Sequence, residues 1–296
     1  MSPPSRSTPA GRAYLDLQKL ARVNGRPVQE LFQLYILEAF LDRLSQSSHR
    51  DRMILKGGVL LAAFGERRPT RDVDLQAQSV ANDADNVRRI ISEIARISID
   101  DGVEFEAESS TADTIRDDEV YAGVRVSVPA TLLTARLPFH VDVNVGDPIT
   151  PGPQEVSVPR LLGGEILVLG YGVGMVHAEK IVTAITRGTT NTRWRDFVDI
   201  FLLAGRHVIE GHNLMRSLRS VATHRETDLV ALAILLDGYA EMAQPRWSAW
   251  RQKQQLEGRV PESFGDILAA VIDFADPAVI GTADGFTWDP MSWSWR

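Results

Sequence analysis

Apolar and polar positions follow helical spacing at the start of the chain and strand spacing through much of its first half. Helical spacing predicts helices over residues 10–23, 27–46 and 82–99. A short apolar run at 53–55 predicts a buried strand that leads into a pair of glycines. β-branched residues alternate with polar ones in four further segments, which predicts strands at 103–108, 120–128, 131–136 and 138–145. Because few residues join these strands, we expect antiparallel neighbours and a mixed or antiparallel sheet.

The pattern changes after a loop rich in proline and glycine at residues 146–153, which is the best candidate for a domain boundary. After a transitional stretch at 154–174, helical spacing predicts helices at about 175–187, 193–204, 211–223, 227–243, 246–257 and 263–275. Beyond Pro277 there is no periodicity; we expect the tryptophans of this tail to pack it onto the body, with stacking on nucleic acid as the alternative. The sequence therefore predicts an α+β, two-lobed protein, with a sheet domain at 1–153 and a mainly helical domain at 154–296.

Length and composition are those of an ordinary globular protein. The 296 residues are 44% hydrophobic and 24% charged, which allows a full core in two domains or in one large one. No apolar run approaches the roughly 18 residues that can span a membrane. The lack of cysteine excludes a disulfide framework and a thiolate metal site, and it suits a reducing cytosol. Residues 1–9 lack the apolar core of a signal peptide and predict a disordered tail, so we expect a cytoplasmic protein.

Charge is unevenly distributed along the chain. The formal net charge of −7 argues against a protein that coats nucleic acid indiscriminately. Residues 180–225 nevertheless carry eight Lys/Arg and three Asp/Glu. This local excess could steer a polyanion to that segment, or it could form no more than a solvated helical surface.

The stretch with the clearest chemistry combines a glycine pair with two nearby carboxylates. Gly57 and Gly58 follow the predicted strand at 53–55 and open a helix, and amides at such a helix start can bind an anion. Asp72 and Asp74 are two residues apart on a predicted strand, so their side chains leave the same face. Carboxylates and substrate phosphates are the ligands that Mg²⁺ prefers. The stretch therefore predicts a binding place for a nucleoside triphosphate and its metal.

This arrangement resembles the signature of the polymerase-β-like nucleotidyltransferase superfamily, in which Gly-Gly or Gly-Ser and a spacer precede Asp-apolar-Asp-apolar. Gly57-Gly58 and Asp72-Val73-Asp74-Leu75 match it, with residues 59–71 as a long spacer. Two segments, Lys56-Gly57-Gly58 and Arg71-Asp72-Val73-Asp74-Leu75, resemble one branch of this superfamily more closely. That branch is the AbiEii-type nucleotidyltransferase toxins of bacterial toxin–antitoxin systems, which include the MenT toxins. The resemblance covers most of residues 50–205 and implies that the sheet domain is nucleotidyltransferase-like.

The resemblance also implies roles for further residues of the sheet domain. Asp142, an isolated carboxylate in a β-branched strand, is the candidate third metal ligand beside Asp72 and Asp74; the alternative is a solvent-facing residue. Lys56 would belong to the active site and reach the phosphates or the attacking group, unless it is a strand-end lysine in solvent. Arg71 could contact phosphate, or it could screen the repulsion between Asp72 and Asp74.

A second cluster matches the same toxins: a Glu-Lys pair, a downstream arginine and then Arg-Asp-aromatic-x-Asp. Carried over, Lys180 would hold triphosphate oxygens and Asp196 would orient that lysine or touch the nucleotide. Arg187 lies two helical turns after Lys180, on the same face, and would assist nucleotide binding. The alternative for Asp196 is an exposed salt bridge worth at most about 1 kcal/mol.

Taken together, these features predict a Mg²⁺-dependent enzyme with its active site in the cleft between the lobes. The resemblance implies that the protein is a toxin. It also implies that the acceptor is the 3′ end of tRNA, whose blocking would stop aminoacylation and growth. A cognate antitoxin is the expected partner, and we expect a monomer. Two alternatives remain open: transfer of a nucleotide to a protein hydroxyl, and a catalytically idle protein that only binds nucleotide or antitoxin. Phosphorylation of Thr70, close to the metal-binding acids, would repel substrate.

Overall fold

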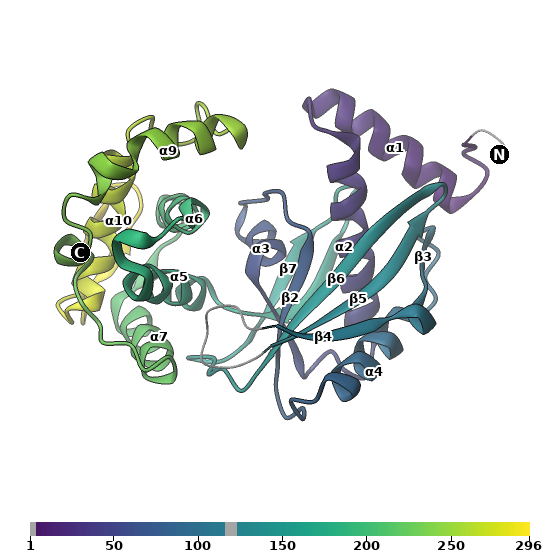
Figure 1. Cartoon of the computed structure of the whole chain (residues 1–296), viewed down its shortest axis with the longest axis horizontal. Coiled ribbons are helices and arrows are strands. Elements are labelled where there is room, and N and C mark those ends of the chain that lie inside the picture. Colours follow the sequence, from purple (N-terminus) through teal and green to yellow (C-terminus); the bar gives the residue numbers. More distant parts are fainter. Residues whose placement is uncertain (1–3, 116–122) are drawn as a thin grey trace. The chain divides into compact units, whose positions relative to one another are not determined.

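The computed structural model describes residues 4–115 and 123–296, which fall into two compact units. The first unit comprises Met1–Asp147 and Pro153–Tyr171, and the second comprises Pro148–Gly152 and Gly172–Arg296. The first unit carries a mixed sheet with helices, and the second is mainly helical (Figure 1). The predicted α+β class is confirmed. Residues 120–122 of one predicted strand lie outside the described residues.

The first unit is built on a sheet of eight described strands in the order β3-β5-β6-β2-β1-β8-β7, with β4 also pairing β5. Two neighbouring pairs, β1–β8 and β2–β6, are parallel and the others are antiparallel, so the sheet is mixed as predicted. The strands are β1 Met53–Lys56, β2 Asp72–Ala77, β3 Val103–Phe105, β4 Thr111–Ile115, β5 Gly123–Leu132, β6 Ala135–Val145, β7 Gln154–Pro159 and β8 Glu165–Gly170.

Helices cover one face of this sheet. Helices α2 (Val28–Gln46) and α4 (Ala84–Ala95) pack on it, and α1 (Pro9–Asn24) packs on α2. The shorter helices of the unit are α3 Gly57–Leu60 and the 3₁₀ segments η1 Leu61–Phe64 and η2 Ala107–Ser109. Alternation along the strands buries one set of side chains, including Val126 and Val141, under the helices. The other set faces away from them and includes the polar residues of the candidate site.

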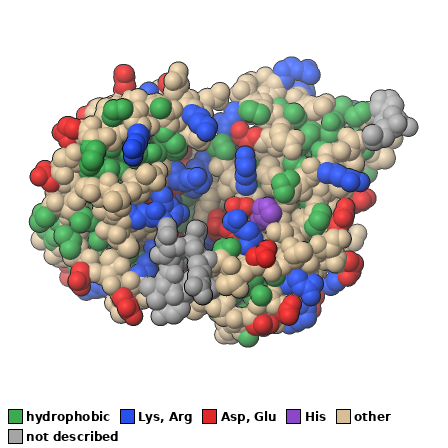
Figure 2. Space-filling view, in the orientation of Figure 1, with side chains coloured by type: hydrophobic (Ala, Val, Ile, Leu, Met, Phe, Trp, Pro, Cys, Tyr) green, Lys and Arg blue, Asp and Glu red, His purple; other side chains and the backbone are tan. Residues whose placement is uncertain are grey.

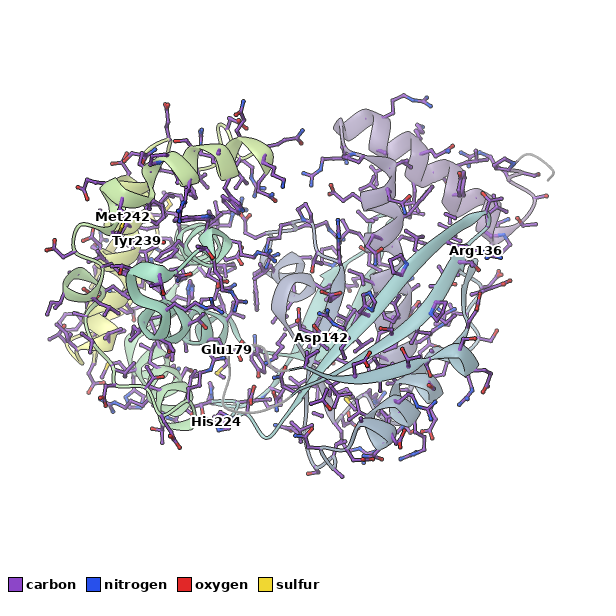
Figure 3. The ribbon with its side chains drawn as sticks, viewed as in Figure 1. Arg136, Asp142, Glu179, His224, Tyr239 and Met242 are labelled. Carbon is purple, nitrogen blue, oxygen red and sulfur yellow. The ribbon has the colours of Figure 1, made fainter. Side chains whose placement is uncertain are left out.

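The polar face of the sheet is visible on the surface. Figure 2 shows acidic, basic and histidine side chains gathered over it. In Figure 3, Asp142 and Arg136 mark two positions along β6. The register pairs Arg125 with Asp142, Ser127 with His140 and Thr131 with Arg136. Each pair is directly opposite, so its members project from the same face.

The central hairpin differs from the sequence prediction. Strands β5 and β6 run without the predicted break around residues 128–131 and meet at a two-residue turn, Leu133–Thr134, where Leu133 has a φ of 54°. The prolines that suggested separators, Pro129 and Pro138, are instead opposite each other within the paired strands. The predicted break was therefore wrong, because a proline is accepted in a strand where its missing N–H is not needed for the hydrogen-bond ladder. Strand β4 was not predicted.

Residues 154–171 also have a different structure from the predicted transitional stretch. Strands β7 and β8 form an antiparallel hairpin, and β8 runs parallel to β1 with Leu55 opposite Gly170. The hairpin therefore belongs to the sheet of the first unit, whereas the sequence prediction assigned it to the helical domain. Part of the predicted disordered tail at residues 1–9 is ordered: Thr8 caps α1 by accepting a hydrogen bond from Gly11, and Arg6 pairs with Asp16 at 2.6 Å.

The second unit is a set of helices with one small sheet. Helix α10 packs on α6, α7, α8 and α9, and α5 packs on α6 and α7. The predicted boundary between helices at 227–243 and 246–257 was wrong. The structure has a short helix followed by a longer one that continues through Pro245. The elements are α5 Val173–Arg187, η3 Gly188–Thr190, α6 Trp194–Ala204, α7 Gly211–His224, α8 Leu232–Leu235, α9 Tyr239–Lys253, α10 Phe264–Val279, β9 Ile209–Glu210, β10 Thr287–Asp289 and β11 Ser294–Trp295.

The tryptophans of the C-terminal tail pack it onto the helices of the second unit, as expected. Trp288 is fully buried and its indole N–H donates to the Ala204 carbonyl at 2.8 Å. The indole N–H groups of Trp293 and Trp295 donate to carbonyls of α10, at Ala270 and Phe274. Among the described helices of both units, none combines the length and apolarity needed to cross a membrane.

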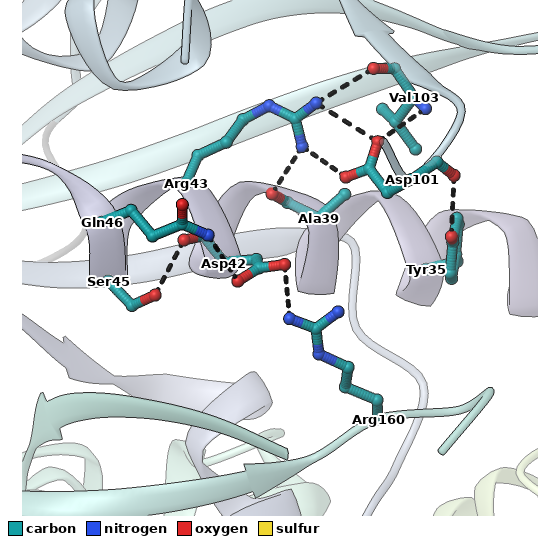
Figure 4. Close-up of polar contacts among 9 residues, drawn as sticks. All are labelled: Tyr35, Ala39, Asp42, Arg43, Ser45, Gln46, Asp101, Val103 and Arg160. Atoms are coloured by element: carbon teal, nitrogen blue, oxygen red, sulfur yellow. Dashed lines mark hydrogen bonds and ion pairs between the residues drawn. The ribbon is translucent and has the colours of Figure 1, made fainter. Parts of the chain in front are cut away.

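A buried ion pair attaches the loop before β3 to α2 (Figure 4). The Arg43 guanidinium donates to both carboxylate oxygens of Asp101, at 2.5 and 3.3 Å, and to the carbonyls of Ala39 and Val103. The Val103 amide in turn donates to Asp101, and the Tyr35 hydroxyl donates to the Asp101 carbonyl. Both charged side chains are less than 10% exposed.

Removing one partner of this pair should destabilise the protein strongly. Asp101→Ala leaves the Arg43 guanidinium buried without its carboxylate, and we expect the free energy of unfolding to fall by roughly 3–5 kcal/mol. The control is Asp51→Ala, because the Arg50–Asp51 pair is exposed and its loss should cost no more than about 0.5 kcal/mol. Urea denaturation measures both, and equal losses in the two variants would contradict the expectation.

Candidate active site

The turn after β1 is shaped around one carboxylate. Gly57 has a φ of +65°, and a Cβ built on it would lie 1.9 Å from Asp74 Oδ2 and 2.6 Å from Asp74 Cβ. The next amide, of Gly58, donates to Asp74 Oδ2 at 3.3 Å. Glycine is therefore required at position 57 both by the backbone angle and by the approach of Asp74. In this structure the glycine pair holds a carboxylate of the chain itself.

Three carboxylates share the face of the sheet that the helices leave open. Lys56 is opposite Asp74 across β1 and β2, and Asp74 is opposite Asp142 across β2 and β6. Asp72 projects from the same face as Asp74, because residues two apart on a strand do so. Side chains directly opposite on paired strands lie close together. The structure thus brings together the predicted residues Lys56, Asp72, Asp74 and Asp142.

Helix α2 fixes the strands that carry these acids. The Gln33 side-chain amide donates to the carbonyl of Arg71, just before β2, at 3.2 Å and to that of Pro138 in β6 at 3.0 Å. Gln33 is buried, and a buried amide that bonds two strands resists a slip between them. The predicted site residue Arg71 has an exposed side chain beside Asp72.

The carboxylates of β2 are electrostatically strained. Burial, and secondly the charge of Asp142, raise the pKa of Asp74 to about 6, although Lys56 and the Gly58 amide act in the opposite direction. Burial and Asp142 likewise raise the pKa of Asp72 above its ordinary value, against the opposing influence of Arg125. Crowded carboxylates with raised pKa values are common at sites that bind cations or perform catalysis.

Arg125 on β5 forms an ion pair with Asp142 on this face. Its Nε and a terminal nitrogen donate to the two Asp142 oxygens at 2.7 and 2.6 Å, and the same terminal nitrogen lies 3.5 Å from Asp72 Oδ2. A bidentate guanidinium–carboxylate pair is the strongest common geometry for such an interaction. Asp142 therefore lies on the site face as expected, but it is paired with an arginine.

Lys56 is buried beside a second small cluster. Its Nζ lies 3.3 Å from Asp147 Oδ2 and 5.9 Å from the centre of the Tyr171 ring. With the Gln76 amide oriented to suit its neighbours, its nitrogen donates to Asp147 at 3.1 Å and its oxygen accepts from the Gly146 and Asp147 amides. The alternative of a solvent-exposed Lys56 was wrong, since this lysine is only 8% exposed.

The donor set accounts for part of a divalent-metal site. Asp72 and Asp74 are carboxylates on one face, the chemistry that Mg²⁺ prefers. A bound cation would favour the ionised form of Asp74, which burial and secondly the charge of Asp142 disfavour. In the described ranges, however, no three acidic, histidine or cysteine side chains are arranged to hold a metal ion. Asp142 is held instead by Arg125. Two of the predicted ligands therefore fit a cation, and the third is engaged elsewhere.

A pocket of about 530 Å³ lies on the same sheet face, along β5 and β6. Its lining includes Ser127, Pro129, Thr131, Arg136, Pro138 and His140. His140 is opposite Asp72 in the parallel register of β2 and β6, and its Nδ1 lies 2.9 Å from the Ser127 hydroxyl. The pocket therefore begins next to the acidic residues.

The second predicted cluster forms within the second unit. Lys180 Nζ on α5 donates to Asp196 Oδ1 at 2.9 Å and to Asp199 Oδ2 at 2.7 Å, both on α6. Arg193 lies 3.1 Å from Asp196 Oδ2. Both aspartates are buried, so the alternative of an exposed salt bridge at Asp196 was wrong. Figure 3 shows the neighbouring residue Glu179 on the same helix. Arg187 lies in the last turn of α5.

One helical turn before Lys180, α5 buries a histidine in an apolar setting. His177 is fully buried, its ring packs on Phe274 at a centroid distance of 4.6 Å, and neither ring nitrogen has a hydrogen-bond partner among the described residues. Burial, followed by the positive charges of His207 and Lys180, lowers the pKa of His177 to about 3. His177 is therefore neutral in the folded protein at neutral pH.

Sequence reasoning missed two groups that the geometry adds to these clusters, Arg125 and Asp147, and it included Asp199 in the motif without giving it a role. A two-residue turn at Leu133–Thr134 would have placed Arg125 opposite Asp142, but the misplaced strand break hid that register. Asp199 follows Asp196 by three residues, a helical spacing that brings both carboxylates to one lysine. No local pattern marks Asp147, which reaches Lys56 from the loop after β6.

A glycine turn that holds one carboxylate, with further acids on the same face of two adjacent strands, is the arrangement that the sequence motifs led us to expect of a nucleotidyltransferase. A family described as "Nucleotidyl transferase AbiEii toxin, Type IV TA system" matches residues 39–270, well over half of the chain. The chain therefore belongs to the AbiEii nucleotidyltransferase toxins, which confirms the resemblance drawn from the motifs.

Two solved structures are similar to this chain. One, described as a nucleotidyltransferase from H. pylori, has 14% sequence identity, a TM-score of 0.49 and coverage of 91% of this chain and 97% of its own. The other, JHP933 from Helicobacter pylori, has 14% identity, a TM-score of 0.48 and coverage of 91% and 94%. No curated protein matches the chain.

Replacing Gly57 should displace Asp74. Gly57→Ala combines a left-handed backbone angle with a clash that includes the Asp74 Cβ, which a change of rotamer cannot move. The control Gly25→Ala has a similar φ of +62° but no atom within 4 Å, so it isolates the backbone cost of about 1–2 kcal/mol. We expect urea denaturation to show a larger loss for Gly57→Ala. Equal losses would mean that the contact with Asp74 imposes no constraint.

The buried His177 should make the protein sensitive to mild acid. Its folded pKa of about 3 lies below the ~6.5 of an unfolded histidine, so protons favour the unfolded chain as the pH falls below ~6.5. We expect this residue to lower the free energy of unfolding by about 2 kcal/mol at pH 5 relative to pH 7. His177→Leu should remove this part of the pH dependence in urea titrations, whereas the exposed-site control His212→Gln should retain it. An unchanged pH profile in His177→Leu would refute the assignment.

Proposed function

We propose that this protein is a Mg²⁺-dependent nucleotidyltransferase that adds nucleotides from a nucleoside triphosphate to the 3′ end of tRNA. The observation that carries the proposal is the shared sheet face of Asp72, Asp74 and Asp142, with Gly57 and Gly58 packed against Asp74, in a member of a nucleotidyltransferase toxin family. The tRNA acceptor rests on the family resemblance, since a fold and a site do not by themselves identify an acceptor. A tRNA acceptor would place the reaction in the cytoplasm.

Residues of the first unit would provide the charges that the reaction needs. A bound Mg²⁺ would neutralise the triphosphate and favour ionisation of the attacking hydroxyl. Asp72 and Asp74 are proposed to hold it. Lys56, opposite Asp74, would offset the negative charge of the phosphates from beside the metal-binding acids. The exposed Arg71 and the amides of Gly57 and Gly58 are proposed to contact the nucleotide.

In the second unit, the proposed nucleotide ligand is Lys180. Asp196 and Asp199 each accept a hydrogen bond from its ammonium, so the position of the charge is fixed before substrate binds. This is the orienting role proposed for Asp196. Arg187 on the same helix is proposed to add a second positive charge. Because Lys180 joins two buried carboxylates, its replacement would also disturb α5 and α6, and a functional test is sharper at Asp74.

As a toxin of a toxin–antitoxin family, the protein has an antitoxin as its counterpart. Blocking the 3′ end of tRNA would prevent aminoacylation, which explains how a nucleotidyltransferase could arrest growth. The same site could instead modify a protein hydroxyl, or it could bind nucleotide without turnover. These readings predict different labelled products.

One experiment separates the three readings. Purified protein is incubated with each radiolabelled nucleoside triphosphate and Mg²⁺, together with either total tRNA or a protein extract. Label on tRNA that is lost after trimming of the 3′ end supports the proposal. Label on protein supports the second reading, and nucleotide binding without labelled product supports the third.

Asp74→Asn should separate activity from stability. The substitution removes a carboxylate whose raised pKa shows that its charge is unfavourable in the folded state, so we expect a free energy of unfolding at pH 7 equal to or above that of the wild type. Nucleotidyl transfer should fall by at least about 100-fold, an effect typical of losing a group that stabilises charge in the transition state. Growth inhibition on expression should disappear.

The matched control for this variant is Glu104→Gln, which removes an exposed carboxylate from β3 of the same sheet. It should retain transfer activity and toxicity. Wild-type activity in Asp74→Asn would move the site elsewhere, and loss of activity in both variants would point to a general charge effect.

A further inference from the structure

The position of Arg125 bears on how many metal ions the site can hold. Nucleotidyl transfer is commonly served by two divalent ions, one for the attacking and one for the leaving oxygen. The third carboxylate of the face, Asp142, is the ligand that this chain could offer to a second ion beside Asp72 and Asp74. In this structure both of its oxygens accept hydrogen bonds from Arg125, at 2.7 and 2.6 Å.

The guanidinium lies between the two strands that carry the acids. Besides its two bonds to Asp142, it approaches Asp72 Oδ2 to 3.5 Å. Its charge lowers the energy of ionised Asp72, which burial and Asp142 otherwise disfavour. A guanidinium is always protonated and has no lone pair to offer a metal. A cation of this kind can therefore neutralise carboxylates at the position of a metal ion without acting as one.

The backbone register fixes Arg125 at this place. Arg125 is directly opposite Asp142 in the antiparallel pairing of β5 and β6. A one-residue slip would turn the side chain to the helix-covered face. The tight turn at Leu133–Thr134 and the nine consecutive residue pairs between these strands oppose such a slip. Arg125 is thus built into the site by the longest hairpin of the sheet.

The charges of the face agree with a single divalent ion. Asp72, Asp74 and Asp142 carry three negative charges, and Arg125 balances one of them through the pair at Asp142. Lys56, opposite Asp74, is paired with a further acid, Asp147. The remaining two lie on Asp72 and Asp74, next to each other on β2. One divalent cation balances that remainder. A second one would have to displace a bidentate guanidinium, one of the strongest partners that a carboxylate finds in proteins.

We propose that Arg125 takes the place of a second metal ion, so that this protein binds one divalent cation, at Asp72 and Asp74, and uses Asp142 to hold Arg125. The proposal rests on the proposed nucleotidyltransferase function and adds the metal count and the role of a residue outside the sequence motif. Arg125 is a positioning residue in this account, because it acts through Asp142 and Asp72.

The test counts bound Mn²⁺, a paramagnetic substitute for Mg²⁺, by the loss of the free-ion signal in electron paramagnetic resonance of the full chain. Wild type should bind one ion. Asp142→Asn should still bind one ion with a dissociation constant within about 3-fold of wild type, because Asp142 is not a ligand of that ion in this account. A tenfold change in the dissociation constant would correspond to about 1.4 kcal/mol. Arg125→Met, which retains the length of the side chain but not its charge, should bind a second ion that is lost again in Arg125→Met/Asp142→Asn.

Several outcomes would overturn the proposal. They are two ions of similar affinity in wild type, a loss of more than tenfold in affinity in Asp142→Asn, or an unchanged count in a folded Arg125→Met. Circular dichroism and thermal unfolding establish that each variant is folded. If Arg125→Met does not fold, Asp142→Asn decides alone, because an asparagine oxygen can still accept a hydrogen bond from Arg125.

The inference and the proposed function can fail separately. Two bound ions in a protein that labels tRNA would refute the single-ion site and leave the function intact. One bound ion that depends on Asp74, in a protein that labels no tRNA, would support the metal count and refute the acceptor. Retention of Mn²⁺ by Asp74→Asn would refute the metal site that both share.

Discussion

The parallel pairing of β2 with β6 is the constraint on which the candidate site depends. This register sets Asp74 beside Asp142 on one face, and the hydrogen bonds of Gln33 to both strands resist a slip that would separate them. Burial, and secondly the charge of Asp142, disfavour the ionised forms of Asp72 and Asp74 and raise their pKa values. The backbone ladder and the helix-covered apolar face supply the stability that holds these acids together. The site is therefore imposed by the sheet.

Two other buried ionic clusters of the protein combine carboxylates with cations. Arg43 meets Asp101 with both carboxylate oxygens satisfied and two carbonyls as further acceptors. Lys180 is shared by Asp196 and Asp199, and Arg193 adds a second positive charge to Asp196. The face of β2 differs, because acids outnumber the cations that contact them. A local excess of charge that the fold does not neutralise is a physical reason to expect a charged ligand there.

The sequence predicted the acids of the site better than it predicted the strands around them. Asp72 and Asp74 follow from spacing alone, and the helices at residues 10–46 and 175–204 follow from apolar periodicity close to their observed ends. The hairpin β7–β8 was missed because its partner, β1, lies about a hundred residues earlier, and no local pattern records that pairing. Burial of Asp196 was also missed, because apolar spacing placed this residue on the polar side of α6. The carboxylate can be buried because Lys180 on α5 donates a hydrogen bond to it.

The turn at Leu133–Thr134 shows how a local feature can decide the chemistry of a distant residue. Leu133 follows Arg125 by eight positions, yet the turn sets which β6 residue meets the arginine. With one residue more or fewer in the loop, Arg125 would face a valine neighbour of Asp142 or lie under α2. Asp142 would then be available to a metal ion, and the charge of the face would favour a second cation. In the single-ion proposal, the metal count of this protein therefore depends on the length of this hairpin as well as on its acidic motif.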